Sequence, residues 1–280
     1  MADITAIILT KNEEKNITAC INSIKDTVKR IVVVDSGSTD KTVEIAKSLG
    51  AETIVHELDP FTQAKQFLYA MDTLTITTKW VLRIDADERL TKDSANEIER
   101  FCNDNAYTDI NGMILRFEVN FMGKKLKHGG IYPFKKLVLF KYGKGNIEDR
   151  EMDEHINLFE GRAIEAKCDC EHIDYKDLTA WIDKHNKYSS REVNDYFAYK
   201  SGEDQNAAHL SGAAKIKRFI KFKIYYRLPG GFRARCYYFY RYILKGGFLD
   251  GKEGKYFAFM QAYWYRMLVD AKIREREKNS

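Results

Sequence analysis

Residues 80–90 read WVLRIDADERL, Trp80 to Leu90, and this stretch decides the fold. A mostly apolar run ends at three acids, Asp85, Asp87 and Glu88, as is typical of a buried strand that ends at solvent. In an open α/β sheet, ligands bind beyond the carboxyl ends of the strands. Two carboxylates there can hold Mg²⁺, which completes its coordination with water and substrate phosphates. The alternative is a solvated acidic turn.

The chain before this stretch alternates between strand and helix patterns. Short β-branched or apolar runs predict strands, and apolar residues at helical spacing between them predict helices. The predicted strands are 4–9, 30–35, 51–55 and 80–84, and the predicted helices are 17–24, 41–49 and 61–71. This alternation predicts a parallel sheet with helices on both faces. No glycine-rich phosphate loop follows any strand, which argues against dinucleotide-binding and P-loop proteins.

The pattern changes after a helix predicted at 94–102. Strands are predicted at 112–121, 137–142 and 156–166 without helices between them, so antiparallel or mixed strands should complete the sheet. A helix is predicted at 178–199. Three basic helical segments follow from residue 213, interrupted at 229–231 and at 246–247, and Asp250 is expected to cap the last one.

Composition indicates a folded chain, because 44% of the 280 residues are hydrophobic and 31% are charged. Five scattered cysteines form no disulfide framework, and neither a secretory leader nor a run of about 18 apolar residues is visible. Reduced thiols in a cytosol are therefore expected, without a transmembrane helix.

Charge is distributed unevenly along the chain. The whole chain carries a net charge of +5, but residues 213–280 hold 17 Lys/Arg against 5 Asp/Glu. This basic segment is also rich in Phe and Tyr. Basic, aromatic, amphipathic helices can lie on an anionic membrane surface. Packing of the aromatic rings on the catalytic domain and binding of single-stranded nucleic acid are the alternatives; nucleic acid is not expected as a partner.

Polar side chains follow three of the predicted strands: Thr10 to Glu13, Asp35, and Asp85 to Asp87. Because the carboxyl ends of parallel strands meet at one edge of a sheet, these residues should converge on one site. A carboxylate at the second strand end can accept a hydrogen bond from a base or a ribose hydroxyl. Asp35 could equally cap the following helix, and Asn12 could cap the first helix.

Three motifs, AIILTKNEE, VVVDSGSTDKT and WVLRIDADERL, resemble those of family 2 glycosyltransferases of GT-A fold over residues 3–175. The resemblance implies an α/β fold of GT-A type (Rossmann-like), with a mixed, mainly parallel sheet flanked by helices and a helical C-terminal extension. We expect a catalytic domain at 1–212, with a nucleotide-sugar half at about 1–105 and an acceptor half at about 106–212, and an extension at 213–280.

The same resemblance implies roles for individual residues. Asp85 and Asp87 would bind a Mg or Mn cation and the diphosphate. The residues expected to bind the nucleotide sugar are Thr10, Asn12, Glu13, Asp35, Lys65, Arg83, Asp85 and Asp87. Gln63 and Gln66 lie beside Lys65, where the family often has polar residues that face the donor.

Later motifs, GGIYPFKKLVLF and MDEHI, resemble the bacterial branch that builds lipopolysaccharide core, capsule and exopolysaccharide. This implies a nucleoside-diphosphate sugar donor, of UDP type first, and a glycan or lipid-linked glycan acceptor. It also implies a peripheral location on the cytoplasmic face of the inner membrane.

Family 2 enzymes invert the anomeric centre, which requires one general base and a cation for the leaving diphosphate. We expect Glu154 to be the base, with Asp153 as the next candidate; a solvated loop is the alternative. His172 is a candidate third metal ligand, although a structural histidine is the commoner case. The prediction is an inverting, metal-dependent hexosyltransferase. Its rivals are a sugar-nucleotide nucleotidyltransferase and a non-catalytic nucleotide- or glycan-binding protein at the membrane.

Overall fold

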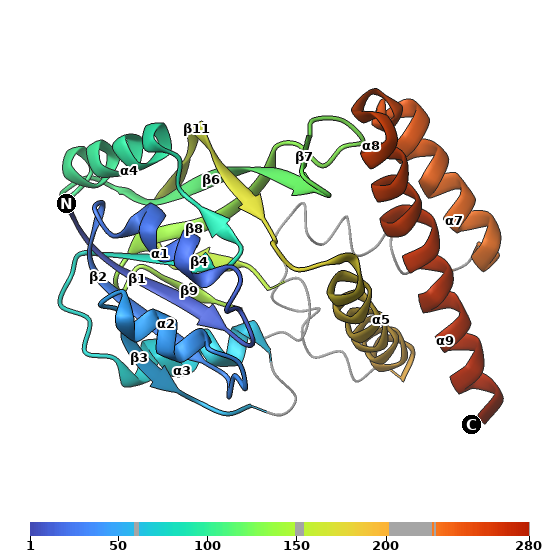
Figure 1. Cartoon of the computed structure of the whole chain (residues 1–280), viewed down its shortest axis with the longest axis horizontal. Coiled ribbons are helices and arrows are strands. Elements are labelled where there is room, and N and C mark those ends of the chain that lie inside the picture. The colour runs from blue at the N-terminus through green and yellow to red at the C-terminus, as the bar shows by residue number, and fades with distance from the viewer. Residues whose placement is uncertain (59–61, 149–153, 202–225, 227, 280) are drawn as a thin grey trace. The chain divides into compact units, whose positions relative to one another are not determined.

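The structure is a computed structural model that describes residues 1–58, 62–148, 154–201, 226 and 228–279 (Figure 1). The chain divides into two compact units. The sheet unit comprises residues 1–125 and 132–176, and the helical unit comprises residues 126–131 and 177–280. The predicted catalytic domain extended to residue 212, whereas helix α5 (Leu178–Ser201) groups with the helical unit.

The first half of the sheet unit alternates strands and helices as predicted. Its elements are β1 (Ala2–Thr10), α1 (Ile17–Ile24), β2 (Val28–Asp35), α2 (Thr42–Ser48), β3 (Glu52–Val55), α3 (Gln63–Thr73), β4 (Trp80–Asp85), β5 (Glu88–Arg89) and α4 (Lys92–Asp104). Strands without long helices follow: β6 (Ile110–Phe121), β7 (Lys124–Leu126), β8 (Phe134–Lys141), β9 (Gly145–Ile147), β10 (Ile156–Leu158) and β11 (Arg162–Ile173).

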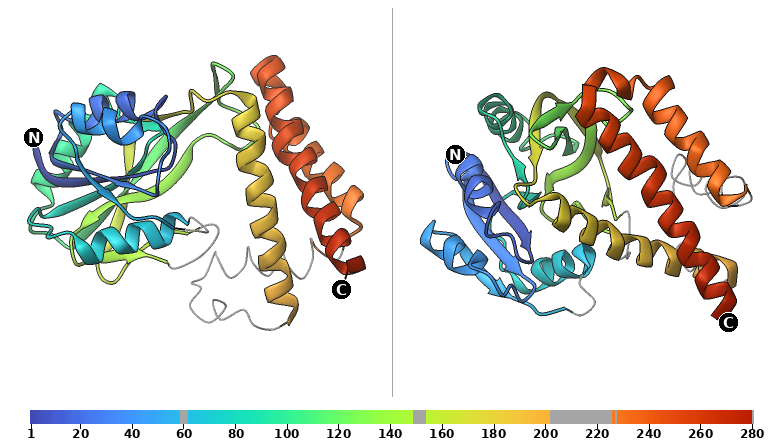
Figure 2. Two further views of the ribbon diagram at one scale, coloured as in Figure 1. Left: turned by 60° about the horizontal axis from the view of Figure 1, so that its bottom comes forward. Right: turned by 45° about the vertical axis from the view of Figure 1, so that its right-hand side comes forward.

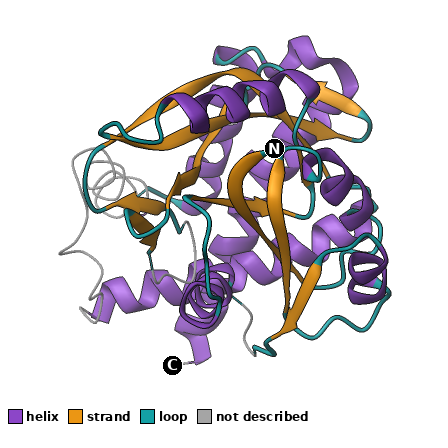
Figure 3. Ribbon diagram, turned by 90° about the vertical axis from the view of Figure 1, so that its left-hand side faces the viewer, coloured by secondary structure: helices purple, strands orange, loops and turns teal. Residues whose placement is uncertain are grey.

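The main sheet has the strand order β3-β2-β1-β4-β8-β6-β11-β5, with β7 paired to β6 off this path. Strands β1 to β4 are mutually parallel in their pairings, β8 runs antiparallel to β4 and β6, and β11 runs parallel to β6. A separate antiparallel pair joins β10 to β9. The expected mixed, mainly parallel sheet is therefore present (Figure 3).

One predicted strand was wrong. Residues 156–166 form parts of two strands, because the chain turns between Leu158 and Arg162 through Gly161, which has a left-handed φ of 74°. A Cβ at Gly161 would come within 2.4 Å of the Asp109 carbonyl oxygen, so the turn has no room for a side chain. Because of this turn, β10 pairs with β9 and β11 pairs with β6.

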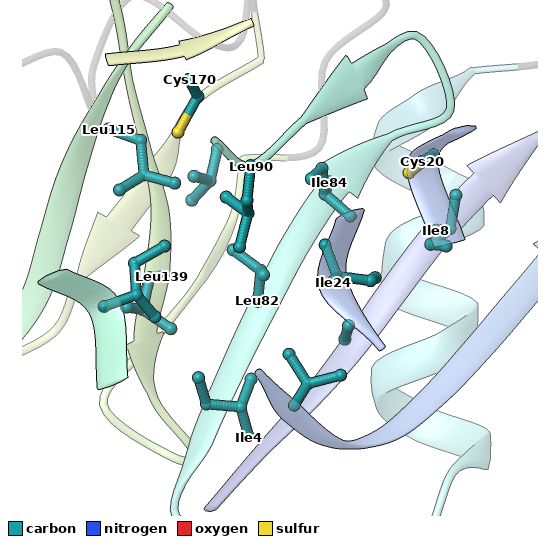
Figure 4. Packing of buried hydrophobic residues seen from close by; sticks show 14 of the residues in the cluster. Ile4, Ile8, Cys20, Ile24, Leu82, Ile84, Leu90, Leu115, Leu139 and Cys170 are labelled. Atoms are coloured by element: carbon teal, nitrogen blue, oxygen red, sulfur yellow. The ribbon is translucent and has the colours of Figure 1, made fainter. Parts of the chain in front are cut away.

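Successive side chains of each parallel strand point to opposite faces of the sheet, and apolar residues lie on both faces. Ile4, Ala6 and Ile8 of β1 pack in one cluster with α1 and α4, while Ile7 and Leu9 pack in another with α3. Part of the first cluster is drawn in Figure 4, where Ile8 lies beside Cys20 and Leu82 faces Leu139. Burial on both faces explains why these strands read as continuous apolar runs. It also holds the strand ends in fixed register.

The helical unit consists of α5, α7 (Gly230–Phe239), a π-helical turn η4 (Tyr240–Leu244), a 3₁₀ turn η5 (Gly247–Asp250), α8 (Gly251–Ala258), a π-helical turn η6 (Phe259–Trp264) and α9 (Tyr265–Asn279). Helices α5 and α9 lie side by side (Figure 2) and bury Val193 against Tyr265, Val269 and Ile273. The first predicted basic segment lies mostly outside the described residues. In the part of the chain that is described, no helix combines the length and hydrophobicity needed to cross a membrane.

His185 gives the helical unit a pH-dependent stability. Its ring stacks on Trp181, with centroids 3.5 Å apart, and lies edge-on to Tyr265. Burial lowers the pKa of His185 to about 4, and the hydrogen bond to the Trp181 carbonyl opposes this shift only in part. Since an unfolded histidine has a pKa of about 6.5, the unfolded chain binds more protons between these two values.

We therefore expect stability to fall as the pH drops from 7 towards 4.5, and to fall less in His185→Phe. Urea unfolding of the full chain at several pH values measures the two slopes. Equal slopes for wild type and variant would contradict the burial of a neutral imidazole.

Candidate functional site

The sheet register brings the predicted polar residues to one edge. Thr10 of β1 pairs with Asp35 of β2, and Leu9 of β1 pairs with Asp85 of β4. Since neighbouring strands are about 4.8 Å apart, Asp35 and Asp85 lie roughly 10 Å apart across β1. The strand ends therefore meet at one edge of the sheet unit, as predicted.

Asp35 organises the loop that follows β2. Its side chain is only 1% exposed. One carboxylate oxygen accepts hydrogen bonds from the Thr10 hydroxyl (2.8 Å) and the Ser38 hydroxyl (2.6 Å), and the other accepts from the Ser38 amide (2.7 Å). Asp35 does not cap α2, because the Thr42 amide donates to Asp40. The expected contact between Asp35 and a nucleoside stays a prediction.

Asn12 and Glu13 tie the loop after β1 to the loop after β2. The Asn12 amide donates to Ser38 Oγ, and Asn12 Oδ1 accepts from the Thr39 amide at 2.8 Å. Asn12 has a left-handed φ of 57°, so its side chain turns towards the neighbouring loop. The prediction that Asn12 caps α1 was wrong, because the cap position is Asn16.

The carboxylate of Glu13 faces inwards at the same edge. It pairs with Lys176 and accepts a hydrogen bond from the Asn16 side chain at 2.8 Å. Burial raises the pKa of the Glu13 carboxyl despite Lys176 and Asn16, and the charge of Asp87 adds to this increase. Glu13 is thus electrostatically coupled to the acids that follow β4.

Arg83 is the buried centre of the site. One of its guanidinium nitrogens donates to Gln63 Oε1 at 2.8 Å and lies 3.5 Å from Asp85 and 3.7 Å from Glu154. The structure therefore brings together three predicted site residues from β4 and from the loop before β10. Arg83 Nε is buried and makes no hydrogen bond within the described residues. A buried donor of this kind favours a polar ligand.

Lys136 of β8 supplies a second buried cation. Its amine lies 2.9 Å from Asp85 Oδ2 and also contacts Glu88, whose side chain is 0% exposed. Burial alone would lower the pKa of Lys136, but Asp85 and Glu88 raise it above its ordinary value. Burial likewise favours neutral Asp85, but Lys136 and Arg83 hold the pKa of that carboxyl well below its usual range. Both oxygens of Asp85 are therefore engaged by cations from the chain itself.

Asp87 and His172, both predicted as metal ligands, lie close together. His172 Nε2 lies 3.6 Å from Asp87 Oδ2, across the β5–β11 pairing. Ligands of an octahedral ion bound at about 2.1 Å are roughly 3 Å apart when adjacent and about 4.2 Å apart when opposite. The observed distance of 3.6 Å is about 0.6 Å longer than the adjacent value, so the two side chains would have to move slightly closer to bind one ion. Within the described residues no three acidic, histidine or cysteine side chains form a metal site, so other ligands would come from water and a diphosphate.

Asp153, Glu154 and Lys65 were also predicted as site residues. Asp153 lies outside the described residues, whereas Glu154 is largely buried next to Arg83. Lys65 is exposed on α3, while its neighbour Gln66 is buried and its Oε1 accepts a hydrogen bond from His56 Nδ1 at 3.1 Å. Gln66 Nε2 makes no hydrogen bond within the described residues. On α3, Gln63 and Gln66 therefore point inwards and Lys65 points outwards.

The sequence reasoning missed two cations of the site, Lys136 and Lys176. Lys136 belongs to β8, which runs antiparallel to both of its neighbours, and Lys176 lies beyond the end of the last strand, β11. Lys136 stands next to Lys135 at the start of an apolar run, and the sequence does not show which of the two lysines is buried. Lys176 follows β11 and gives no local signal.

Comparison with known proteins decides the family. Residues 5–155, more than half of the chain, match the family model described as Glycosyl transferase family 2. The chain belongs to glycosyl transferase family 2. The matched residues include the ends of β1, β2 and β4 and extend to His155, next to Glu154.

Among curated family 2 relatives, an uncharacterized glycosyltransferase of Rickettsia typhi is 44% identical over 99 residues, which are 35% of this chain and 32% of that protein. The SPbeta prophage-derived glycosyltransferase SunS of Bacillus subtilis is 35% identical over 99 residues, which are 35% of this chain and 23% of that protein. The matched region therefore spans about a third or less of these relatives.

Among solved structures, the mannosyltransferase PcManGT of Pyrobaculum calidifontis, in complex with GDP-Man and Mn²⁺, matches with a TM-score of 0.53 and 17% identity. The match covers 97% of this chain and 86% of that chain. It confirms the predicted GT-A-like fold, a mainly parallel mixed sheet flanked by helices with a C-terminal helical region.

We expect Lys136→Met to destabilise the sheet unit by about 3 kcal/mol, because it removes the lysine from buried Glu88 and leaves Asp85 with Arg83 alone. Lys135→Met on the same strand is the matched control. Lys135 pairs with Glu165 at the surface, so its loss should cost less than about 1 kcal/mol. Urea unfolding at neutral pH measures both.

Adding Glu88→Gln to Lys136→Met should restore part of the lost stability, since one of the two carboxylates that lost Lys136 is removed. Equal unfolding midpoints for Lys136→Met and Lys135→Met would show that Lys136 does not balance these acids.

Proposed function

We propose that this protein is an inverting, metal-dependent glycosyltransferase that moves a hexose from a nucleoside-diphosphate sugar to a hydroxyl of a glycan acceptor. The observation that carries the proposal is the pair of Asp87 and His172, with Oδ2 and Nε2 3.6 Å apart, at the strand-end edge that also holds Arg83 and Glu154. This edge offers a cation position beside a buried carboxylate.

The donor end of the site is polar and pre-organised. The loops after β1 and β2 are held together by Asn12, Ser38 and Thr42, so their backbone is fixed before any ligand binds. Buried Ser36 Oγ and Arg83 Nε make no hydrogen bond within the described residues. Ribose hydroxyls and diphosphate oxygens are ligands that such groups can bind. The solved mannosyltransferase of this fold carries GDP-Man and Mn²⁺, the donor class and cation class proposed here.

Asp87 and His172 would hold the Mg or Mn cation. When bound, the cation neutralises the charge that develops on the leaving diphosphate. Asp85 belongs to the same acidic motif, but its oxygens contact Lys136 and Arg83. Asp85 would therefore hold the side chains of Lys136 and Arg83 near the diphosphate. It would bind the metal itself only after losing one of these two contacts.

Glu154 is the proposed general base. Its carboxylate would accept the proton of the acceptor hydroxyl while that oxygen forms a bond to the anomeric carbon, and the bond from that carbon to the diphosphate oxygen breaks. Arg83, 3.7 Å away, orients the Glu154 carboxylate. A single displacement of this kind inverts the anomeric centre and needs no nucleophilic side chain.

The acceptor is proposed from the resemblance to the bacterial branch that builds surface polysaccharides. It would be a lipid-linked glycan, which places the enzyme at the cytoplasmic face of the inner membrane. UDP-sugars are the first donors to test, and GDP-sugars the second.

We expect Asp87→Asn to weaken Mn²⁺-dependent binding of UDP or GDP by about tenfold or more, because it removes one charged metal ligand. Isothermal titration with and without Mn²⁺ measures the effect. Asp104→Asn, an exposed acid at the end of α4, is the control and should bind as wild type does. Wild-type affinity in Asp87→Asn would exclude Asp87 as a metal ligand.

Glu154→Gln should keep nucleotide binding but reduce kcat by about 10² to 10⁴, since the amide cannot accept the proton. A panel of nucleotide sugars with released UDP or GDP as the readout identifies the donor first. Asp153→Asn distinguishes the two candidate bases. Near-normal turnover by Glu154→Gln would remove Glu154 from the role of base.

A further inference from the structure

Exposed apolar side chains are concentrated in one part of the helical unit. Within the described residues, nineteen large hydrophobic side chains are exposed, and ten of them lie between residues 228 and 259. Five of these ten form what we call the apolar corner: Tyr240, Ile243, Leu244, Phe248 and Leu249. Leu244 is 67% exposed and Leu249 is 60% exposed. After Phe259, no large hydrophobic residue of α9 is exposed.

The apolar corner is where the chain turns between two antiparallel helices of this unit. Figure 1 shows α7 running up to this turn and α8 leading from it into α9. Helix η4 ends at Leu244, and Gly246, with a left-handed φ of 69°, lets the chain turn into η5. The rings of Tyr242 and Phe248 meet edge-on across the turn. The exposed residues therefore belong to a folded turn.

Hydrogen bonds from residues 127–129 of the same unit hold this turn. Asp250 was expected to cap the last helix, but its side chain makes no capping bond there. Its carboxylate accepts from the amides of Lys127 and His128 and pairs with His128 Nδ1 at 2.8 Å. The Gly129 amide donates to the Lys245 carbonyl, and Arg241 donates to the Gly129 carbonyl. The corner is thus braced from its inner side and keeps its apolar side chains outside.

The exposed charged side chains of the segment that contains the apolar corner, residues 230–260, are basic. Exposed basic side chains flank it: Arg235, Lys245, Lys252 and Lys255. Between residues 230 and 260 the chain has only two acids. Asp250 is buried and engaged as described, and Glu253 is half-buried. The outer surface here is therefore apolar at the turn and positive around it.

The combination of apolar and basic side chains favours a lipid surface over a protein or a nucleic acid as the partner. Protein interfaces are depleted in lysine relative to the rest of the surface, whereas lysines flank this corner. Single-stranded nucleic acid stacks its bases on aromatic rings, but Ile243, Leu244 and Leu249 are aliphatic. Apolar and tyrosine side chains beside lysines suit the boundary between the acyl chains and anionic headgroups.

We propose that the apolar corner docks the enzyme on an anionic phospholipid surface. Leu244, Phe248 and Leu249 enter the boundary between headgroups and acyl chains, and Lys252 and Lys255 bind the headgroup phosphates. The surface extends the proposed function, because it would place the enzyme beside a lipid-linked acceptor. Its test measures lipid binding alone and does not require transfer.

The experiment is co-sedimentation of the full-length protein with vesicles of phosphatidylcholine, with and without phosphatidylglycerol, at low and high salt. Wild type should bind the anionic vesicles and be released by salt. Leu244→Ser/Leu249→Ser should lose roughly tenfold or more in partition coefficient. Lys252→Glu/Lys255→Glu should lose roughly fivefold for each lysine at low salt.

Two control variants separate this surface from general effects. Phe159→Ser/Leu178→Ser removes exposed apolar groups elsewhere, and Arg274→Glu/Lys278→Glu reverses exposed charges of α9. Both should sediment as wild type does. Thermal unfolding of each variant confirms that it is folded, and the substituted side chains are exposed, so little stability should be lost.

Three results would overturn the proposal. In the first, wild type does not bind anionic vesicles. In the second, the corner variants bind as well as the controls. In the third, wild type is a dimer and Leu244→Ser/Leu249→Ser is a monomer. The last result would assign the corner to a second copy of the chain. Nucleotide titration of the same variants should match wild type, so a failed donor site and a failed lipid surface are told apart.

Discussion

The site depends on the neutralisation of carboxylates that the sheet forces together. Asp85, Asp87, Glu88 and Glu154 come from one strand end and one nearby loop, and Arg83, Lys136 and His172 lie among them. Buried acids without cations would take up protons or destabilise the fold. The cations come from β4, β8 and β11, so the acids gain these partners only when the full mixed sheet has formed. The four acids still outnumber the three cations, and the proposed metal ion would add positive charge at this edge.

The two aspartates of the acidic motif also make different contacts. Sequence reasoning treats Asp85 and Asp87 as equivalent, since one residue separates them. In the structure Asp85 ends β4 and contacts Arg83 and Lys136, whereas Asp87 lies beyond the strand and faces His172. The difference arises because the chain leaves the strand at Asp85 and turns before β5. One acid thus pairs with Arg83 and Lys136, and the other lies beside His172.

The sequence predicted the parts of the site that local pattern determines. The apolar runs before Thr10, Asp35 and Asp85 are strands because they are buried on both faces, and parallel pairing puts their ends together. Lys136 and Lys176 could not be found in this way. Their positions depend on how β8 and β11 join the sheet, which is a matter of long-range register. The turn at Gly161 was missed because a single glycine within a strand pattern also fits a β-bulge, so Glu160-Gly161-Arg162 does not by itself end a strand.

The C-terminal region also has features that the sequence pattern could not predict. Composition identified a basic, aromatic segment but treated its aromatic residues as one population. The structure separates them: Tyr265 packs with Val193 and Val269, while Tyr240 and Phe248 remain exposed. Helical periodicity does not distinguish the two groups well, because π-helical turns at 240–244 and 259–264 shift the faces of the helices along the chain. A π-turn adds a residue to a helical turn, so residues beyond it lie on a different face from the one that regular helical spacing predicts. Composition and regular periodicity together therefore could not have located the apolar corner.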